Sequence, residues 1–272
     1  MTGGAGPVER LVRHDRRIVM LAVLVIVVIA AAYTVLGVGM EMSALEMTRM
    51  AREIGAPMDM DGAMAWDMRH ALLIFLMWWV MMIAMMTPSA APLLLLYTAV
   101  KRRGPDGARA TALSLVLLFG YLLTWAGFSA LATALQWALE RADLVAAAMM
   151  TVKSGLLAGA ILLVAGLYQF TPFKAACLKH CRAPAHFIAA HGRPGFWGAL
   201  RLGGHHGAYC LGCCWALMAL LFVGGVMNLW WIVALALYVL AEKMLAQALW
   251  LTWITGGALI AAGVWLMAVA VY

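Results

Sequence analysis

Residues 18–40 read IVMLAVLVIVVIAAAYTVLGVGM, a run without a single charged side chain. A membrane-spanning helix needs about 20 consecutive apolar residues, so this run predicts a helix that crosses a bilayer. Arg10, Arg13, Arg16 and Arg17 precede it. The run is longer than the apolar region of a cleavable signal peptide, so we expect it to be retained in the protein.

Similar apolar runs follow at 70–100, 110–138, 144–168 and 208–227. The stretch 229–271 is too long for one helix, and we divide it near residues 246–250. These runs predict an all-α, polytopic transmembrane helical bundle with about seven spanning helices, or six as the alternative. Charged residues make up only 11% of the chain, against about 25% in soluble domains, which excludes a soluble fold. Pro88 is expected to break the second helix.

Basic residues are concentrated in the N-terminus, in the linker around 101–109 and in the linker 169–207, whereas the loop 41–69 is net acidic. The positive-inside rule therefore places the N-terminus and both basic linkers in the cytoplasm. The expected organisation is a basic N-terminal segment, 1–17, and one transmembrane domain, 18–272. The positive net charge is explained by orientation in the bilayer, and no nucleic-acid-binding motif is present.

The cysteines form two groups around the linker 169–207: Cys177 and Cys181 lie near its beginning, and Cys210, Cys213 and Cys214 lie just after its end. If the flanking helices are antiparallel neighbours, the groups meet. Thiolates are soft ligands for Cu(I), Zn(II) or iron–sulfur centres. His180 is a candidate imidazole ligand, and His186, His205 and His206 lie in the same region. The alternatives are that the thiols only pack, as free cysteines often do, or that they form a transient disulfide.

Methionine is the second sulfur signal, with 21 residues in the chain. Four of them fall on two faces of the second predicted helix: Met81, Met82, Met85 and Met86. The outer loop adds the Met58, Met60 and Met64 series. Thioethers bind Cu(I), although Met is also an adaptable apolar filler. Thioethers outside and thiols inside are the order expected for reduced copper moving inward.

Three segments carry a family resemblance: residues 81–89 (MMIAMMTPS), 171–182 (TPFKAACLKHCR) and 209–215 (YCLGCCW), the last followed by Met218, Asn228, Glu242 and Lys243. They are similar to bacterial predicted metal-binding integral membrane proteins, over roughly residues 70–250. The resemblance implies metal binding with a link to copper handling. It also implies the bacterial inner membrane, which makes the Met-rich loop 41–69 periplasmic and the Cys-bearing linker 169–207 cytoplasmic.

The leading hypothesis is therefore an inner-membrane protein that handles a soft metal ion, Cu(I) ahead of Zn(II) or an iron–sulfur centre. It would transport the ion or deliver it to a membrane partner. The alternatives are a membrane redox enzyme that uses the Cys cluster and a non-catalytic scaffold. No catalytic residue is predicted, and neither the oligomeric state nor the roles of Glu242 and Lys243 follow from the sequence.

Overall fold

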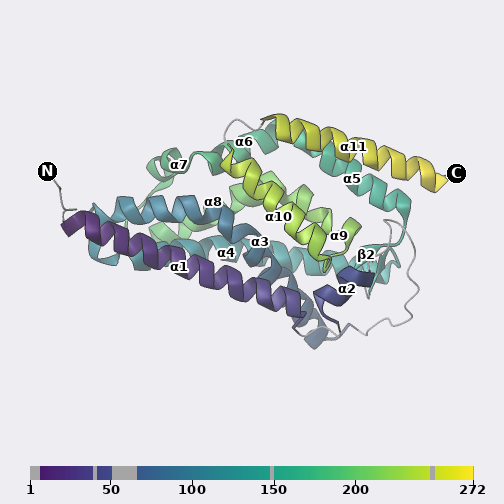
Figure 1. Ribbon diagram of the computed structural model, residues 1–272, viewed down its shortest axis with the longest axis horizontal. Helices are drawn as coiled ribbons and strands as arrows, with labels where there is room; N and C mark the ends of the chain where they lie inside the picture. Colours follow the sequence, from purple (N-terminus) through teal and green to yellow (C-terminus); the bar gives the residue numbers. More distant parts are fainter. Residues whose placement is uncertain (1–6, 39–41, 51–65, 148–149, 246–248, 272) are drawn as a thin grey trace.

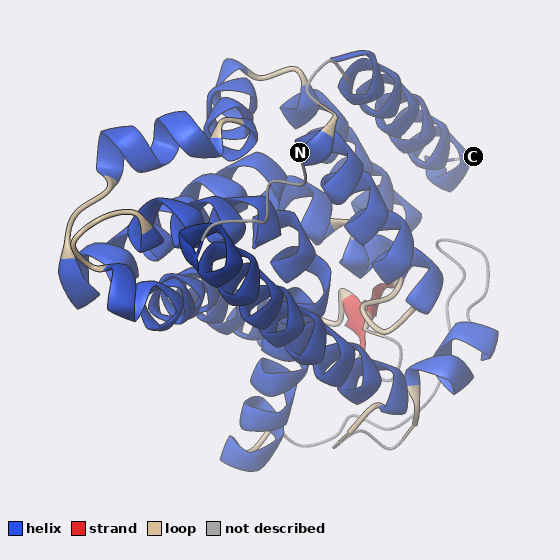
Figure 2. Cartoon of the chain, turned by 60° about the vertical axis from the view of Figure 1, so that its left-hand side comes forward, coloured by secondary structure: helices blue, strands red, loops and turns tan. Residues whose placement is uncertain are grey.

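The fold is described from a computed structural model, which places residues 7–38, 42–50, 66–147, 150–245 and 249–271. The methionines of the outer loop between residues 51 and 65 lie outside this range. The elements are α1 Pro7–Leu36, α2 Ala44–Met50, α3 Met68–Arg102, η1 Gly107–Arg109, α4 Ala110–Arg141, β1 Val145–Ala146, β2 Thr151–Val152, α5 Gly155–Gln169, α6 Pro172–Arg182, α7 Pro184–His191, α8 Gly195–Ala219, α9 Leu221–Gly224, α10 Leu229–Met244 and α11 Leu249–Val271. Helices dominate, and β1 and β2 form one short antiparallel hairpin (Figure 2).

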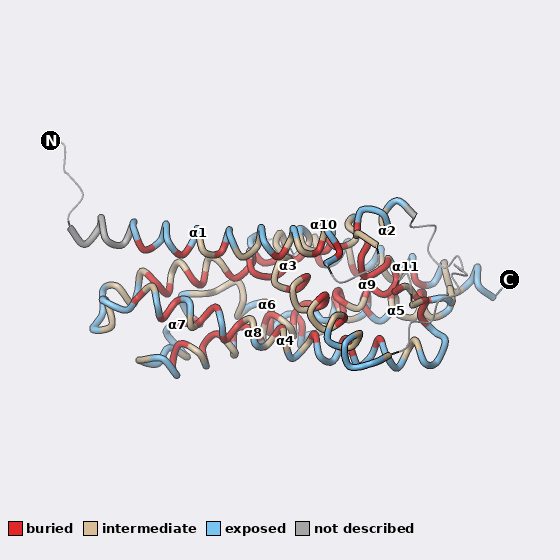
Figure 3. Tube along the Cα trace, turned by 90° about the horizontal axis from the view of Figure 1, so that it is seen from below, coloured by how far each residue is buried: buried red, intermediate tan, exposed pale blue. Residues whose placement is uncertain are grey.

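Five described helices are long and apolar enough to cross a membrane, or six if α5 and α6 together form one bent span. The chain is thus an all-α bundle, and its described residues hold five or six candidate spans, fewer than the seven expected and at most the alternative of six. The long helices run roughly along the same axis (Figure 1). Large apolar side chains on the outer faces of α1 and α11 are exposed, while the buried residues line the interior of the bundle (Figure 3). Such a surface is suited to lipid.

Short-range signals set several helix ends. Asp67 caps α3 by accepting a hydrogen bond from the backbone N–H of His70 at 2.7 Å. Thr171 and Asn228 cap α6 and α10 in the same way. Proline opens α6, where its missing N–H costs nothing. The division of 229–271 into two helices is confirmed, because α10 ends at Met244 and α11 begins at Leu249.

Three predicted boundaries were wrong. The span expected at 144–168 begins only at Gly155, because the β1–β2 hairpin takes the preceding residues. The linker 169–207 is almost entirely helical, since α6, α7 and the first half of α8 fill it. The expected break at Pro88 is absent, and α3 continues through both Pro88 and Pro92 to Arg102. Packing of neighbouring helices against α3 outweighs the hydrogen bond lost at each proline.

Glycines allow two helix pairs to approach closely. On the α4–α8 contact, a Cβ at Gly203 would lie 2.0 Å from the carbonyl oxygen of Leu117. On the α5–α11 contact, a Cβ at Gly159 would lie 2.7 Å from the carbonyl oxygen of Gly263. Small residues at helix contacts let backbones pack directly, which is the usual source of helix association in a bilayer. These two contacts position α6 and α8 in the bundle.

Candidate metal centre

The thiols of α6 and α8 lie together inside the bundle. Between α5 and α6 the chain bends by 64°, and this turns α6 onto α8. The thiol of Cys181 is in contact with that of Cys213, and Cys214 contacts both Cys213 and Cys210. Cys177 is also buried, with its Sγ against Gly212 of α8. The structure therefore places the two cysteine groups side by side, although they are far apart in sequence.

The helical spacing explains why three thiols of α8 share one side. Residues three and four apart lie on the same face of a helix. The thiols of Cys213 and Cys214 both donate to the carbonyl oxygen of Cys210, at 3.1 and 2.9 Å. All five cysteines are free. The site is thus a row of thiols along α8 that α6 extends sideways.

Cys210 has two further polar neighbours. The ammonium group of Lys243, on α10, lies 2.8 Å from the Cys210 Sγ and 3.1 Å from the Ser89 hydroxyl on α3. The hydroxyl of Tyr121, on α4, lies 3.1 Å from the same sulfur. Helices α4 and α10 therefore contact Cys210 directly, and α3 is linked to it through Lys243.

The four methionines of α3 are completely or almost completely buried. Met86 is the nearest of them in the chain to Ser89, and its carbonyl oxygen accepts hydrogen bonds from the hydroxyls of Ser89 and Tyr121, at 2.8 and 3.1 Å. Since Tyr121 also contacts Cys210, one side chain joins the methionine helix to the thiol row. Met85, Met82 and Met81 follow from Met86 along the helix toward its N-terminus, which leads away from the thiols.

A buried ion pair holds α6 against α10. The Lys174 ammonium donates to both carboxylate oxygens of Glu242, at 2.7 and 2.9 Å, and both side chains are 1% exposed. Thr252 of α11 and Tyr238 donate to the same carboxylate. A buried charge is tolerated only when it is paired and hydrogen-bonded. The pair therefore positions the helix that carries Cys177 and Cys181.

The histidines separate into two kinds. His180 is partly exposed, its ring stacks on Tyr209 at 4.2 Å, and its Nδ1 lies 2.8 Å from the Ala176 carbonyl oxygen of its own helix. The structure therefore does not bring His180 into the thiol row. His206 instead lies one turn before Cys210 on α8, is 3% exposed, and its Nδ1 has no hydrogen-bond partner among the described atoms.

The residues fit a soft ion bound by sulfur, but not a preformed cage. Among the described residues, no three His, Cys, Asp or Glu side chains are already placed to hold one metal ion. Methionine is outside that set. The donors present are thiols in mutual contact and one unpartnered imidazole nitrogen, which are ligands that Cu(I) favours.

The sequence singled out neither Tyr121 nor, among the histidines, His206, and it left the role of Lys243 open. For Lys243 a signal existed, because an ionisable residue within an apolar segment is a functional candidate by default. His206 could have been found from its spacing, since it precedes Cys210 by one helical turn. Ser89 belongs to the segment 81–89 that carries the family resemblance, whereas Tyr121 carries no pattern of its own.

A family model described as PpoB2, copper chaperone, matches residues 75–266. The match includes α6, α8, α10 and all five cysteines. No curated protein and no solved structure matches the chain. The family match supports the copper-handling part of the resemblance drawn from the sequence.

Proposed function

The chain belongs to the copper chaperone family, and from that premise we propose that it binds Cu(I) on sulfur in the bacterial inner membrane and delivers the ion to a partner protein. The observation that carries this proposal is the contact between Cys181 of α6 and Cys213 of α8, next to Cys210 and Cys214. Thiols from two helix segments meeting in a buried site form a soft-ligand set.

Within this proposal, Cys181, Cys210, Cys213 and Cys214 are the ligands that hold the ion, and Cys177 flanks them. His206 is the imidazole that replaces the predicted ligand His180, because its buried Nδ1 has no other partner. A buried polar atom without a hydrogen-bond partner lowers the stability of the folded protein by about 1–3 kcal/mol. A bound ion would remove that cost.

Lys243 balances charge in the proposed site. A Cu(I) ion held by two thiolates carries a net negative charge, which is costly inside a protein unless a cation lies beside it. The Lys243 ammonium lies 2.8 Å from the Cys210 Sγ. Among the described residues it forms no carboxylate ion pair, so its positive charge is free to serve the thiols.

The methionines of α3 supply the route to this site. Met81, Met82, Met85 and Met86 follow successive turns of one buried helix segment, and the segment ends where Tyr121 and Ser89 contact the thiol site. Under the proposed orientation, with the N-terminus in the cytoplasm, the segment leads from the periplasmic side inward. Thioether sulfur binds Cu(I) without losing a proton, so it can pass the ion on.

The test is bound copper in protein purified without oxygen and loaded with Cu(I). We expect stoichiometric copper in the wild type and loss of it in the Cys213→Ser, Cys214→Ser double variant. Ala216→Ser is the matched control, since it adds a hydroxyl at a buried position of the same helix without removing a thiol. Met82→Leu with Met86→Leu tests the route, and we expect slower loading with unchanged final copper content.

The alternatives predict different results. Iron, haem or flavin absorption in the purified protein would favour a membrane redox enzyme. Equal copper content in the wild type and the double cysteine variant would leave only a scaffold whose sulfur residues pack. Transfer of copper to a partner would be measured separately, by copper loss from the loaded protein in the presence of candidate acceptor proteins.

A further inference from the structure

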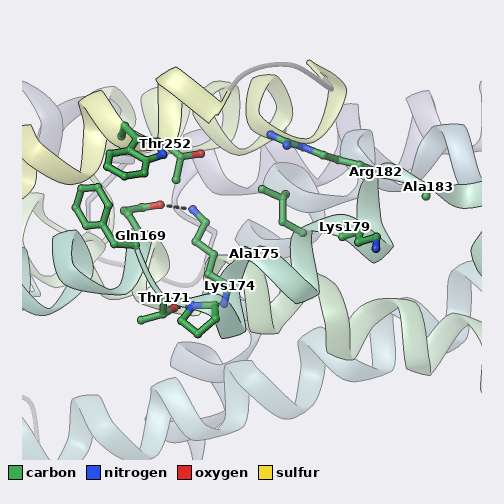
Figure 4. A pocket seen from close by; sticks show the side chains of 12 residues that line it. Gln169, Thr171, Lys174, Ala175, Lys179, Arg182, Ala183 and Thr252 are labelled. Carbon is green, nitrogen blue, oxygen red and sulfur yellow. Dashed lines mark hydrogen bonds between the residues drawn. The ribbon is translucent and has the colours of Figure 1, made fainter.

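A separate cavity lies at the bend between α5 and α6, beside the beginning of α11 (Figure 4). Its volume is about 570 Å³. The chain segment 169–172 forms one wall, α6 forms the floor, and Thr252 and Trp253 of α11 close the other side. None of the five cysteines lines the cavity, so the proposed copper site does not use it.

The cavity is basic. Three cationic side chains line it, Lys174, Lys179 and Arg182, and no acidic residue does. The charge of Lys174 is neutralised by its ion pair with Glu242, which does not itself line the cavity. Arg182 donates only to a backbone carbonyl oxygen, that of Glu242, and Lys179 is exposed and forms no ion pair among the described residues. Two positive charges therefore face the cavity without a counter-ion, which favours an anionic ligand.

Apart from Gln169, Thr171 and Thr252, the remaining lining is apolar. Phe170 and Trp253 are in contact at a ring distance of 5.3 Å, and Trp253 is 65% exposed. Trp253 is the fifth residue of α11, and the rest of that helix to Val271 carries no charge. Tryptophan at the end of an apolar helix is typical of the headgroup level of a membrane. The cavity thus combines two cations that lack a carboxylate partner with an aromatic wall near the beginning of an apolar helix.

We propose that this cavity binds the phosphate group of an anionic phospholipid. Lys179 and Arg182 would hold the phosphate, and the upper acyl chain would lie on Phe170 and Trp253. Basic pockets between membrane helices are a known mode of recognition of anionic lipid headgroups. The Gln169 amide, in the same wall, supports an oxygen-rich ligand, because its Nε2 is buried and has no acceptor among the described residues.

The experiment uses metal-free protein in nanodiscs, so its result is independent of the copper proposal. Lipid retention is measured by mass spectrometry of the released protein, with discs of phosphatidylglycerol and phosphatidylcholine mixed in equal amounts. We expect the wild type to retain phosphatidylglycerol in preference to phosphatidylcholine. Two basic residues near a membrane surface contribute about 1 kcal/mol each, so the Lys179→Gln, Arg182→Gln variant should lower that preference by about tenfold or more.

The control variant Arg103→Gln, Arg201→Gln removes the same charge at two exposed positions away from the cavity, and it should retain the preference. Lys179→Gln alone tests the proposal without disturbing the Arg182 contact to α10, and it should show part of the loss. Equal loss in the control, or no preference in the wild type, would overturn the proposal. Displacement of the lipid by inorganic phosphate alone would also overturn it, because the site would then bind the free anion.

Discussion

The Lys174–Glu242 pair gives the sharpest test of how the site is held together. Glu242→Gln keeps the size of the side chain and an acceptor for Thr252 and Tyr238, but it leaves the Lys174 ammonium buried without a negative partner. Both side chains are 1% exposed, so water cannot compensate. Removing one member of a buried ion pair costs about 3–5 kcal/mol. That is a large share of a typical free energy of unfolding of about 5–15 kcal/mol.

Lys174→Met combined with Glu242→Gln removes both charges and should recover part of the loss. What remains is the loss of the Lys174 hydrogen bonds to Glu242 and Gln169, at about 1 kcal/mol for each neutral bond. We therefore expect the double variant to be more stable than Glu242→Gln alone, by up to about 2 kcal/mol. A coupling of this sign arises only if the two residues interact directly.

The assay is denaturant titration in detergent micelles, with thiol labelling of Cys181 as a second readout. Loss of the pair frees α6, so Cys181 should react faster in Glu242→Gln, while it is partly protected by α8 in the wild type. Lys153→Met is the control, because the Lys153–Asp143 pair is exposed at 37% and 85%, and exposed pairs contribute at most about 1 kcal/mol. The reasoning is refuted if Glu242→Gln matches that control, or if the double variant is no more stable than the single one.

Three further predictions concern other parts of the fold. Gly203→Ala should lower the stability of the protein in thermal unfolding by about 1–3 kcal/mol, because the added Cβ would lie 2.0 Å from a carbonyl oxygen of α4. Gly127→Ala is the control and should not destabilise the protein, because a Cβ there would have no atom within 4 Å. Tyr121→Phe removes the hydroxyl that contacts Cys210, and competition with a Cu(I) chelator should show an affinity lowered by about tenfold or less; an unchanged affinity would remove Tyr121 from the site. Glu46→Gln should speed amide exchange in α2 at neutral pH, because the Ser43 hydroxyl and backbone N–H hydrogen-bond the Glu46 carboxylate and lower its pKa. Because the Glu46 pKa is lower in the folded state, its carboxylate stabilises the fold at pH values above the unfolded-state pKa. This stabilisation is lost as the pH falls through the folded-state pKa, so the difference between Glu46→Gln and the wild type should disappear in acid.

The membrane class of this protein follows from its sequence, for a clear physical reason. In lipid no water is present to hydrogen-bond the backbone, so a long uncharged segment such as 18–40 must satisfy its N–H and C=O groups by forming a helix. The division of 229–271 and the shared helix face of Cys210, Cys213 and Cys214 also follow from local rules of length and periodicity. In contrast, the start of α5 and the continuation of α3 through Pro88 depend on packing between helices. Such packing cannot be predicted from a short stretch of sequence.

Only the tertiary structure decided which side chains meet at the thiol row. The bend before Pro172 turns α6 toward α8, and the buried pair of Lys174 and Glu242 holds it there. The contact of Lys243 with Cys210 and the burial of His206 result from the same arrangement. Each partner is far away in the chain, and its distance is set by how whole helices pack. For that reason the sequence indicates soft-metal binding by sulfur, whereas the tertiary structure shows which sulfur side chains lie together.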